Sequence, residues 1–365
     1  MFKKILINGG LVFFSVAFAL TAFDLAVYLL PKSALPEPLL KLVQQMEIDS
    51  GSPYRQHSVL GFTIKPATDF VFAGEDFTFR FQTRLNFPDA GFRGGTLGGP
   101  VWGEAFGDSF TFGAGVDQAA TWIALLSKLT NREIINFGVP GHGPFQYTRI
   151  LKTYGVPLHP KIVFYALFAN DLKDGMRFEG RQTPRGRNLS IKQFLKKYSA
   201  SYNLFGNLSR LIQRRLRDNK WDGIGVKLLD RKLRSPYDLA DTHFATAWSA
   251  IATQIDDAME ESKRIKATFV LLYFPSKEEV YWELAKPRVK AIEGFEERIK
   301  RLSKTTLNFC QSRHLLCLDL TPALKSRGLR GENLYFPVDI HWNERGHLVV
   351  AEAIHKFLIE NKIVE

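Results

Sequence analysis

The chain has 365 residues, of which 45% are hydrophobic and 24% are charged. This length suffices for one large domain with an insertion or for two small domains, and the ordinary apolar content allows a sizeable buried core. The formal net charge is +12, and residues 173–234 hold 17 Lys and Arg against 5 Asp and Glu, so the rest of the chain is close to neutral.

The N-terminal segment is the first predicted element. Lys3 and Lys4 precede a nearly uninterrupted apolar run over residues 5–30, which exceeds the roughly 20 residues needed to span a bilayer. The two lysines predict a cytoplasmic N-terminus and an exported remainder. A cleavable signal peptide is the alternative, but its apolar core would run only about 7–15 residues. We therefore expect residues 1–30 to be an uncleaved membrane anchor, with the rest of the chain on the periplasmic or extracellular side.

Residues 31–100 are expected to form a stalk and a small β-rich lead-in. Three prolines within residues 31–38 indicate the stalk, and residues 39–47 have a short helical pattern. The segments 68–72 and 77–81 alternate apolar and polar residues, which is typical of half-buried strands.

Residues 101–361 alternate short apolar strands with helical patterns. The predicted strands are 101–106, 133–137, 161–168, 267–274 and 315–320. The predicted helices are 119–129, 145–154, 240–263, 289–310 and 344–360. Such an alternation implies a parallel sheet covered by helices on both faces. Ligands bind such sheets at the carboxyl ends of the strands.

A basic insertion at residues 173–240 interrupts this alternation. Between residues 190 and 217 apolar residues recur with helical spacing, and lysines and arginines fill the opposite face. The pattern fits a surface helix with a solvated charged side, a lid, or a surface that lies on a membrane or on an acidic polymer. For an exported protein, anionic lipid headgroups or an acidic glycan fit this charge, and nucleic acid is not an expected partner.

The two cysteines, Cys310 and Cys317, leave two alternatives open. They match no four-ligand zinc site. In an exported domain they could form a disulfide, and otherwise both are small buried residues.

The tetrapeptide Gly107-Asp108-Ser109-Phe110 follows the first predicted strand of the sheet. A serine on a glycine-loosened turn just past a strand is presented at the surface, where a nucleophile must be. Its hydroxyl needs a base, and the base needs an acceptor on its other nitrogen. His341 and Asp339 fit these two roles, because side chains at i and i+2 of an extended segment point to the same side.

Attack on an ester produces an oxyanion, which needs hydrogen-bond donors fixed in advance. Three candidates lie just beyond predicted strands. They are the backbone N–H of Ser109, the backbone N–H of Gly141 in a glycine-rich loop, and the side-chain amide of Asn170.

The blocks 107–110, 136–141, 170–171 and 339–341 together resemble the four blocks of the SGNH (GDSL-type) hydrolase superfamily, in the expected order over residues 101–361. The resemblance implies a flavodoxin-like three-layer α/β/α sandwich with a central parallel sheet. It also implies Ser109 as nucleophile, Gly141 and Asn170 as oxyanion donors, and His341 with Asp339 as base and orienter. The expected activity is that of a serine esterase or acyl hydrolase that works through an acyl-serine intermediate.

Two departures from the family pattern bear on the acyl acceptor. Phe168 stands where the third block usually has glycine, and the last block reads Asp-x-His-Trp rather than Asp-x-x-His. The shorter form, together with residues 274–281, is similar to the exported polysaccharide O-acetyltransferase branch. Water and a sugar hydroxyl are therefore the two possible acceptors of the acyl group. A non-catalytic role as an assembly partner is the alternative function outside the enzymes.

The remaining candidates lie near these blocks. His142 adjoins an oxyanion donor and Trp342 follows the candidate base, so both are candidate substrate contacts, and His142 and His347 are the alternative bases. No residue cluster has metal-ligand spacing, and no cofactor is expected. The expected partners are an ester, an acetylated glycan or a lipid as substrate, and the membrane through the N-terminal helix.

Overall fold

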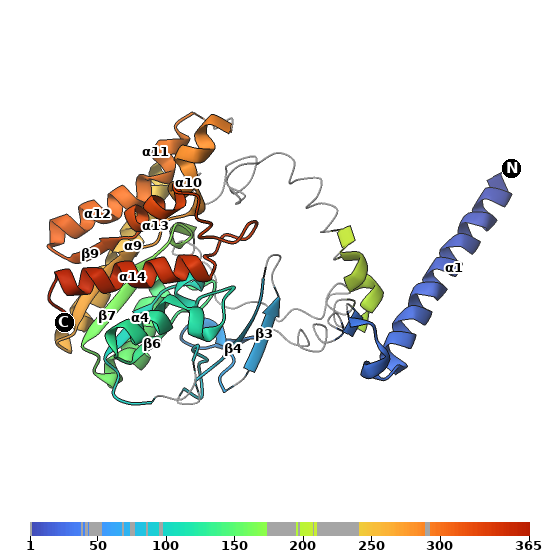
Figure 1. Cartoon of the computed structure of the whole chain (residues 1–365), viewed down its shortest axis with the longest axis horizontal. Helices are drawn as coiled ribbons and strands as arrows, with labels where there is room; N and C mark the ends of the chain where they lie inside the picture. The colour runs from blue at the N-terminus through green and yellow to red at the C-terminus, as the bar shows by residue number, and fades with distance from the viewer. Residues whose placement is uncertain are drawn as a thin grey trace. The chain divides into compact units, whose positions relative to one another are not determined.

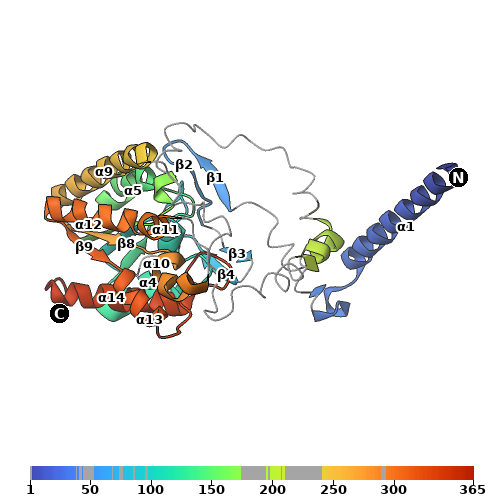
Figure 2. The same ribbon diagram turned by 90° about the horizontal axis from the view of Figure 1, so that it is seen from above.

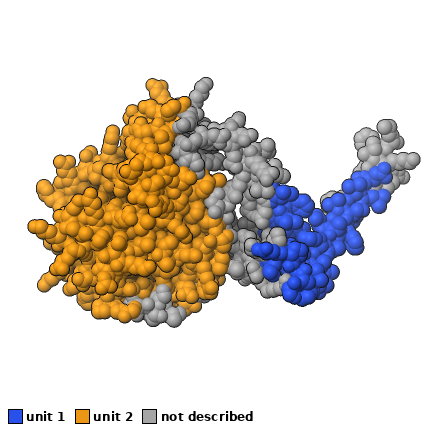
Figure 3. Space-filling model, viewed as in Figure 1, with its two compact units in different colours: residues 1–52, 185–220 blue, residues 53–184, 221–365 orange. Residues whose placement is uncertain are grey.

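The computed structural model describes residues 2–37, 39–40, 43, 53–67, 69–73, 77–84, 87–94, 98–173, 195, 198–206, 208–209, 241–288 and 293–365. It divides into two compact units, which are coloured in Figure 3. Unit 1 consists of residues 1–52 and 185–220, and unit 2 of residues 53–184 and 221–365. Most of the predicted insertion 173–240 and of the predicted helix at 39–47 lies outside the described residues. The boundaries predicted at residues 30, 100 and 361 stay predictions.

Unit 1 is built on a long apolar helix, α1 (Phe2–Leu29), followed by the short helix η1 (Lys32–Ala34). The segment Asn8–Leu29, with 22 residues, is the one helical stretch within the described part of the chain that is long and apolar enough to cross a membrane. Its large apolar side chains are mostly exposed. A second helix, at residues 200–206, belongs to the same unit.

Unit 2 contains a five-stranded parallel sheet in the order β6-β5-β7-β8-β9. The second strand along the chain, β6, lies at the edge of the sheet beside the first strand, β5, and the later strands follow on the other side of β5. This is the flavodoxin-like strand order. The predicted fold class is therefore confirmed. The strands are β5 (Gly103–Phe106), β6 (Ile134–Asn136), β7 (Ile162–Leu167), β8 (Thr268–Tyr273) and β9 (Leu316–Asp319).

Helices cover both faces of the sheet because its strands carry apolar side chains on both sides. All six residues of the central strand β7 are buried. In Figure 2, α5 (Pro144–Ile150), α9 (Asp241–Arg264) and α12 (Arg301–Arg313) lie on one side of the sheet. On the other side lie α4 (Trp122–Thr130), α13 (Thr321–Gly328) and α14 (Glu344–Glu360). Figure 1 shows α4 and α14 side by side, in agreement with their close packing.

The sequence patterns located the strands more accurately than the helices. All five predicted strands are present, shorter by one or two residues at one or both ends. The prediction of one continuous helix at 289–310 is wrong, because the chain forms two helices there, α11 (Phe295–Ile299) and α12. The first of them begins after Gly294, whose φ is +71°. The helix α10 (Lys277–Ala285) was not predicted, although Ser276 and Glu279 form a capping box at its start.

The lead-in forms two hairpins within unit 2. The predicted pair is confirmed as β3 (Asp69–Ala73) and β4 (Thr78–Gln82), whereas β1 (Tyr54–His57) and β2 (Gly61–Ile64) were not predicted. After these hairpins Arg93 is fully buried and donates hydrogen bonds to the carbonyl oxygens of Phe112 (2.9 Å) and Gly113 (2.5 Å). Burial lowers the pKa of Arg93 to about 9. The lead-in thus satisfies the carbonyls at the end of the helix that begins at Ser109.

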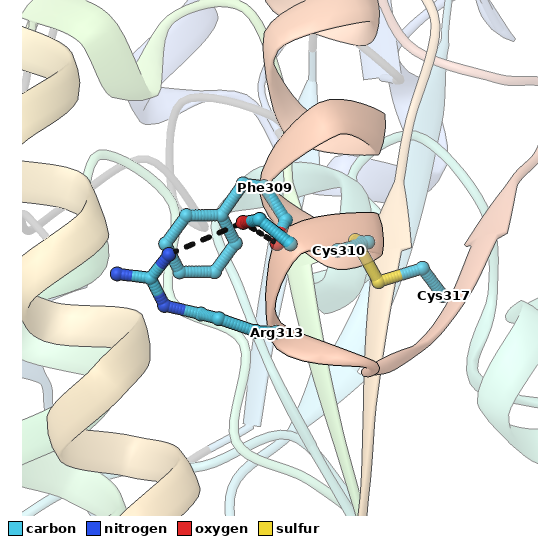
Figure 4. The surroundings of a disulfide bond; sticks show 5 residues. Phe309, Cys310, Arg313 and Cys317 are labelled. Carbon is cyan, nitrogen blue, oxygen red and sulfur yellow. Dashed lines mark hydrogen bonds between the residues drawn. A yellow bond between two sulfur atoms is a disulfide. The ribbon is translucent and has the colours of Figure 1, made fainter.

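The two cysteines form a disulfide that joins the end of α12 to β9 (Figure 4). The Cα atoms of Cys310 and Cys317 are 6.2 Å apart. Beside the disulfide, the guanidinium of Arg313 lies over the ring of Phe309, 3.9 Å from its centre. The disulfide alternative of the sequence analysis is therefore the one that the structure contains.

Candidate active site

Ser109 lies at the carboxyl edge of the sheet, directly after β5. It opens a single helical turn, α3 (Ser109–Phe112), whose N-terminus is capped by the carboxylate of Asp108, which accepts from the N–H of Phe110 at 2.9 Å. A Cβ atom at Gly107 would come within 2.1 Å of the Thr111 hydroxyl. Glycine at this position therefore leaves room for the Thr111 side chain of α3 against the end of β5. The side chains of the last block lie at the same edge.

His341 connects Ser109 to Asp339. The Nε2 atom of His341 lies 2.6 Å from the hydroxyl oxygen of Ser109, and its Nδ1 atom lies 2.5 Å from Oδ1 of Asp339. The backbone N–H of His341 also donates to Oδ1 of Asp339, at 2.9 Å. Ser109 is 8% exposed, so its hydroxyl is held in place but stays within reach of solvent. The structure brings together the three residues that the sequence analysis proposed as nucleophile, base and orienter.

The charge of Asp339 determines which nitrogen of His341 carries the proton. Burial acts to raise the pKa of Asp339, but the hydrogen bond and charge of His341, with a smaller contribution from Lys277, outweigh it and lower that pKa below its ordinary value. An ionised carboxylate can only accept hydrogen bonds, so Nδ1 of His341 must donate to it. The lone pair of Nε2 then faces the Ser109 hydroxyl, which is the arrangement that proton abstraction from this serine requires.

The three predicted oxyanion donors also lie at this edge. The N–H of Ser109 opens α3, where the first N–H groups of a helix have no acceptor within the helix. Gly141 has a φ of +82° and is exposed, and no other residue of the described chain accepts a hydrogen bond from its N–H. Asn170 follows β7, and its Nδ2 atom donates one hydrogen bond to Oδ2 of Asp108 at 2.8 Å. An amide nitrogen has two N–H groups, so one N–H of Asn170 remains for a ligand.

Two buried carboxylates hold these donors in place. Asp108, as the helix cap, is tied to both Phe110 and Asn170 and lies 3.4 Å from the Ser109 hydroxyl. Burial raises the pKa of Asp108, and the hydrogen bonds from Phe110 and Asn170 act against that rise. Asp171 accepts from the Tyr147 hydroxyl at 2.7 Å and from the N–H of Phe168 at 2.8 Å, which fixes the turn after β7.

Aromatic side chains pack around Phe110, the residue that follows Ser109. The ring of Phe110 packs against Phe168 at 4.1 Å between ring centres, and against His341 and Trp342 at 4.9 Å each. Phe168 is the residue that replaces the usual glycine of the third block. Its ring supports Phe110, which in turn supports the imidazole of His341. The departure from the family pattern thus has a packing role.

The two predicted substrate contacts are enclosed by protein. Trp342 is fully buried among Phe110, Phe274 and Tyr335. His142 is also fully buried, its Nε2 lies 2.8 Å from the carbonyl oxygen of Phe62, and burial lowers its pKa to about 4. Neither side chain presents a surface to solvent in this structure, and their contact with substrate stays a prediction. Their burial supports the loops that carry Gly141 and His341.

The alternative bases are engaged elsewhere. His347 lies inside α14, accepts a hydrogen bond from the N–H of Trp122 at 3.2 Å, and has its pKa lowered to about 3 by burial. Among the histidines that the structure describes, only His341 hydrogen-bonds to Ser109. In the same described part of the chain, no group of three or more His, Cys, Asp or Glu side chains could hold a metal ion.

Sequence reasoning missed two residues that support the site. Arg93 holds the end of α3, and the nearly fully buried Lys277 donates to the carbonyl oxygen of Phe336 at 2.6 Å, at the start of the loop that carries Asp339. Lys277 follows the capping-box serine of α10, so a correct assignment of that helix would have placed it near the carboxyl end of β8. No signal in the sequence indicates the role of Arg93.

Comparison with known proteins identifies the family. Residues 105–349 match the model of the GDSL-like lipase/acylhydrolase family. No curated protein matches the chain significantly. Similar solved structures include a putative lipolytic protein of the G-D-S-L family from Desulfitobacterium hafniense, at 13% identity and a TM-score of 0.40, covering 71% of this chain and 99% of that one. A catalytic mutant of an acetylxylan esterase from Geobacillus stearothermophilus has 12% identity and a TM-score of 0.40, covering 72% and 95%.

Likenesses at this identity and TM-score say nothing about the substrate. The family model, in contrast, spans most of unit 2 and includes Ser109, Gly141, Asn170 and His341. On that match, the chain belongs to the GDSL-like lipase/acylhydrolase family of serine hydrolases.

Proposed function

We propose that this protein is a membrane-anchored, extracytoplasmic serine esterase that acts through an acyl-Ser109 intermediate. The observation that carries the proposal is the hydrogen-bonded chain from Ser109 through His341 to Asp339, with distances of 2.6 and 2.5 Å. The match to the GDSL-like lipase/acylhydrolase family supports it.

In the first half of the proposed reaction, the Ser109 hydroxyl oxygen attacks the carbonyl carbon of the ester while His341 Nε2 takes the hydroxyl proton. The resulting oxyanion accepts hydrogen bonds from the N–H groups of Ser109 and Gly141 and from the Asn170 amide. The bond to the alcohol oxygen then breaks, and His341 returns the proton to that oxygen. The negative charge of Asp339 stabilises the imidazolium that exists between these two transfers.

In the second half, an acceptor hydroxyl takes the place of the departed alcohol. His341 removes its proton, the acceptor oxygen attacks the acyl carbon, and the bond to Ser109 breaks as Ser109 regains its proton. With water as acceptor the product is a free acid, and with a sugar hydroxyl the product is an acetylated glycan. Transfer is kept as the second candidate because the Asp-x-His-Trp spacing resembles the exported polysaccharide O-acetyltransferase branch.

The membrane location rests on different residues. The segment Asn8–Leu29 is long and apolar enough to span a bilayer, and most of its large side chains are exposed within unit 1. Lys3 and Lys4 before it favour a cytoplasmic N-terminus, which puts unit 2 outside the cytoplasm.

The test measures p-nitrophenyl acetate turnover by the full chain in detergent, with Ser109→Ala and Lys356→Ala as variants. Lys356 is exposed on α14 and serves as the matched control. We expect Ser109→Ala to abolish turnover and Lys356→Ala to retain it. Full turnover by Ser109→Ala would refute the proposed nucleophile.

Adding an oligosaccharide acceptor separates the two candidate acceptors. If free acetate alone appears, the enzyme is a hydrolase. If p-nitrophenol release accelerates and the acetyl group appears on the sugar, the acceptor is a glycan hydroxyl.

A further inference from the structure

A second helix is fixed to the C-terminal half of α1 within unit 1. Residues 200–206 form this helix, which lies beside the end of α1 in Figures 1 and 2. The N–H of Ser201 donates to Oδ1 of Asp24 at 2.7 Å, and the Ser201 hydroxyl donates to Oδ2 of Asp24 at 3.0 Å. Ala200 and Val27 form a small buried cluster with Phe23 packed against it. The two helices are therefore joined by polar and apolar contacts at one place.

This junction explains how an aspartate is accommodated in an apolar helix. A charged side chain at the centre of a bilayer is unfavourable, because it loses its hydration. Asp24 avoids the centre, because it lies five residues before Leu29, which is about 7.5 Å along the axis at about 1.5 Å per residue. Both of its carboxylate oxygens also accept hydrogen bonds from Ser201. The junction thus lies at interfacial depth if α1 spans the membrane.

The joined helix exposes apolar side chains next to this depth. Leu204, Phe205 and Leu208 are 47%, 57% and 48% exposed, and residue 208 is again helical. Leu204 and Leu208 have the i, i+4 spacing that puts two side chains on one face of a helix. The end of α1 likewise exposes Leu25 and Leu29. Helices that lie in the membrane interface bury their apolar face about 5–10 Å into the boundary between headgroups and acyl chains. The depth set by Asp24 falls within that range.

The sequence on either side of this helix is basic. Three lysines precede it within residues 192–197, and four arginines follow it within residues 210–217. Lysines and arginines beside an apolar helical face are typical of segments that bind anionic lipid surfaces. Binding to a protein partner does not require basic residues beside the end of an apolar membrane helix, whereas binding to an anionic lipid surface does. The position of the charge therefore favours lipid.

We propose that residues 198–206 and 208–209 form an interfacial segment that lies on the outer leaflet, with Leu204, Phe205 and Leu208 among the lipids. The hydrogen bonds between Asp24 and Ser201 attach this segment to the anchor. The proposal rests on the membrane anchor of the proposed function. It adds a second lipid contact, one that fixes the outer end of α1 at a defined depth.

The experiment places a fluorophore on single introduced cysteines of the full chain. The native cysteines are joined in a disulfide, so a maleimide-NBD reagent without reductant labels only the new one. Phe205→Cys and Leu208→Cys test the interfacial segment, Leu11→Cys tests the anchor, and the exposed Lys356→Cys on α14 is the control. The proteins are reconstituted in vesicles of phosphatidylethanolamine and phosphatidylglycerol that carry nitroxide-labelled acyl chains.

We expect nitroxide lipids to quench NBD at positions 205 and 208 at least about twofold more strongly than at position 356, because the label lies within the apolar boundary. The substitution Ser201→Ala should lower the quenching at position 205, because it removes the hydroxyl hydrogen bond to Asp24 and leaves only the one from the backbone N–H. Two positions are labelled so that one poorly folded variant does not decide the outcome.

The other results separate the two proposals. Strong quenching at position 11 with quenching at 205 and 208 equal to that at 356 would overturn the interfacial segment and leave the anchor intact. Absence of quenching at 11, 205 and 208 alike would overturn both. An apolar NBD spectrum at 205 without lipid quenching would show that protein covers this face, for example a second copy of the chain, and would also overturn the proposal.

Discussion

Buried carboxylates at the carboxyl edge of the sheet have hydrogen-bond donors around them, whereas the buried carboxyl group in the middle of β5 does not have any within the described residues. At the edge, Asp108 accepts hydrogen bonds from Phe110 and Asn170, and Asp339 accepts two from His341. Only four residues before Asp108, Glu104 is fully buried, and neither of its carboxyl oxygens has a hydrogen-bond partner within the described part of the chain. Burial without partners raises the pKa of Glu104 to about 8.

This contrast shows that burial alone does not identify a functional acid. The carboxylates at the edge are surrounded by donors, which orient their neighbours. These donors hold the pKa of Asp339 below its ordinary value and act against the rise that burial causes in the pKa of Asp108. The described residues provide no such donor for Glu104, and burial raises its pKa to about 8 because ionisation in an apolar surrounding is costly, which favours the protonated form at neutral pH. We therefore expect changes at the edge to affect activity and changes at Glu104 to affect stability.

The largest expected effect is that of Asp339→Asn. An amide in place of the carboxylate can donate to Nδ1 of His341, which favours the wrong tautomer and leaves the imidazolium without a counter-charge. We expect kcat to fall by about 10⁴, with an unchanged free energy of unfolding within about 1 kcal/mol. Steady-state kinetics and urea unfolding of the same preparation measure both quantities. A loss of less than tenfold in kcat would mean that Asp339 does not orient the base.

The next effect is that of Asn170→Ala. Removing one oxyanion donor lowers kcat by about 10²–10³, because the donor acts on charge that develops only in the transition state. We expect KM to change little. A rise in KM at constant kcat would instead assign Asn170 to ground-state binding of the substrate.

A smaller effect is expected for Asp108→Asn. Asp108 touches Asn170 and caps α3, so it acts as a positioning residue. Hydrogen bonds to charged groups contribute about 1.5–3 kcal/mol, which corresponds to a loss of about 10- to 100-fold in kcat. If Asp108 acts through Asn170, the double variant with Asn170→Ala should be little worse than Asn170→Ala alone. Independent, multiplicative losses would contradict that connection.

The smallest effect on activity, and the clearest effect of pH, is expected for Glu104→Gln. In the unfolded chain a glutamate loses its proton near its ordinary pKa of 4.5, whereas in the folded protein burial raises the pKa of Glu104 to about 8. Rising pH between these values therefore favours the unfolded state, by up to about 1.4 kcal/mol per pH unit. Glu104→Gln removes this dependence and should be the more stable protein near pH 7.5, with unchanged kcat.

Urea unfolding at about pH 5.5 and about pH 7.5 tests this expectation. The difference in stability between Glu104→Gln and the natural protein should grow with pH in favour of the variant. A difference that stays constant across this range would mean that Glu104 titrates alike in the folded and unfolded states.

Much of the site could be predicted from the sequence because its residues lie just beyond apolar strands. Parallel strands bring their carboxyl ends to one edge, so Ser109, Gly141 and Asn170 were expected to converge. The Asp339-x-His341 spacing in an extended loop predicted their pairing, and the structure contains it. These inferences use only local periodicity and the rules of parallel sheets.

The supporting contacts could not be predicted in the same way, because they join segments far apart in the chain. Arg93 reaches α3 from the lead-in, and its role depends on where the hairpins pack. The burial of Trp342 and His142 is likewise a property of packing, whereas their neighbours in the sequence suggested contact with substrate. The hydrogen bond between Asp108 and Asn170 depends on the pairing of β5 with β7, which local sequence patterns do not show.

Covalent labelling identifies the nucleophile of the proposed reaction. The full chain is treated with a fluorophosphonate probe, digested and mapped by mass spectrometry, together with Ser109→Ala and His341→Ala. We expect one adduct, on Ser109, which is absent from Ser109→Ala and forms far more slowly in His341→Ala. An adduct on another serine, or ester hydrolysis by a protein whose Ser109 is never labelled, would contradict it.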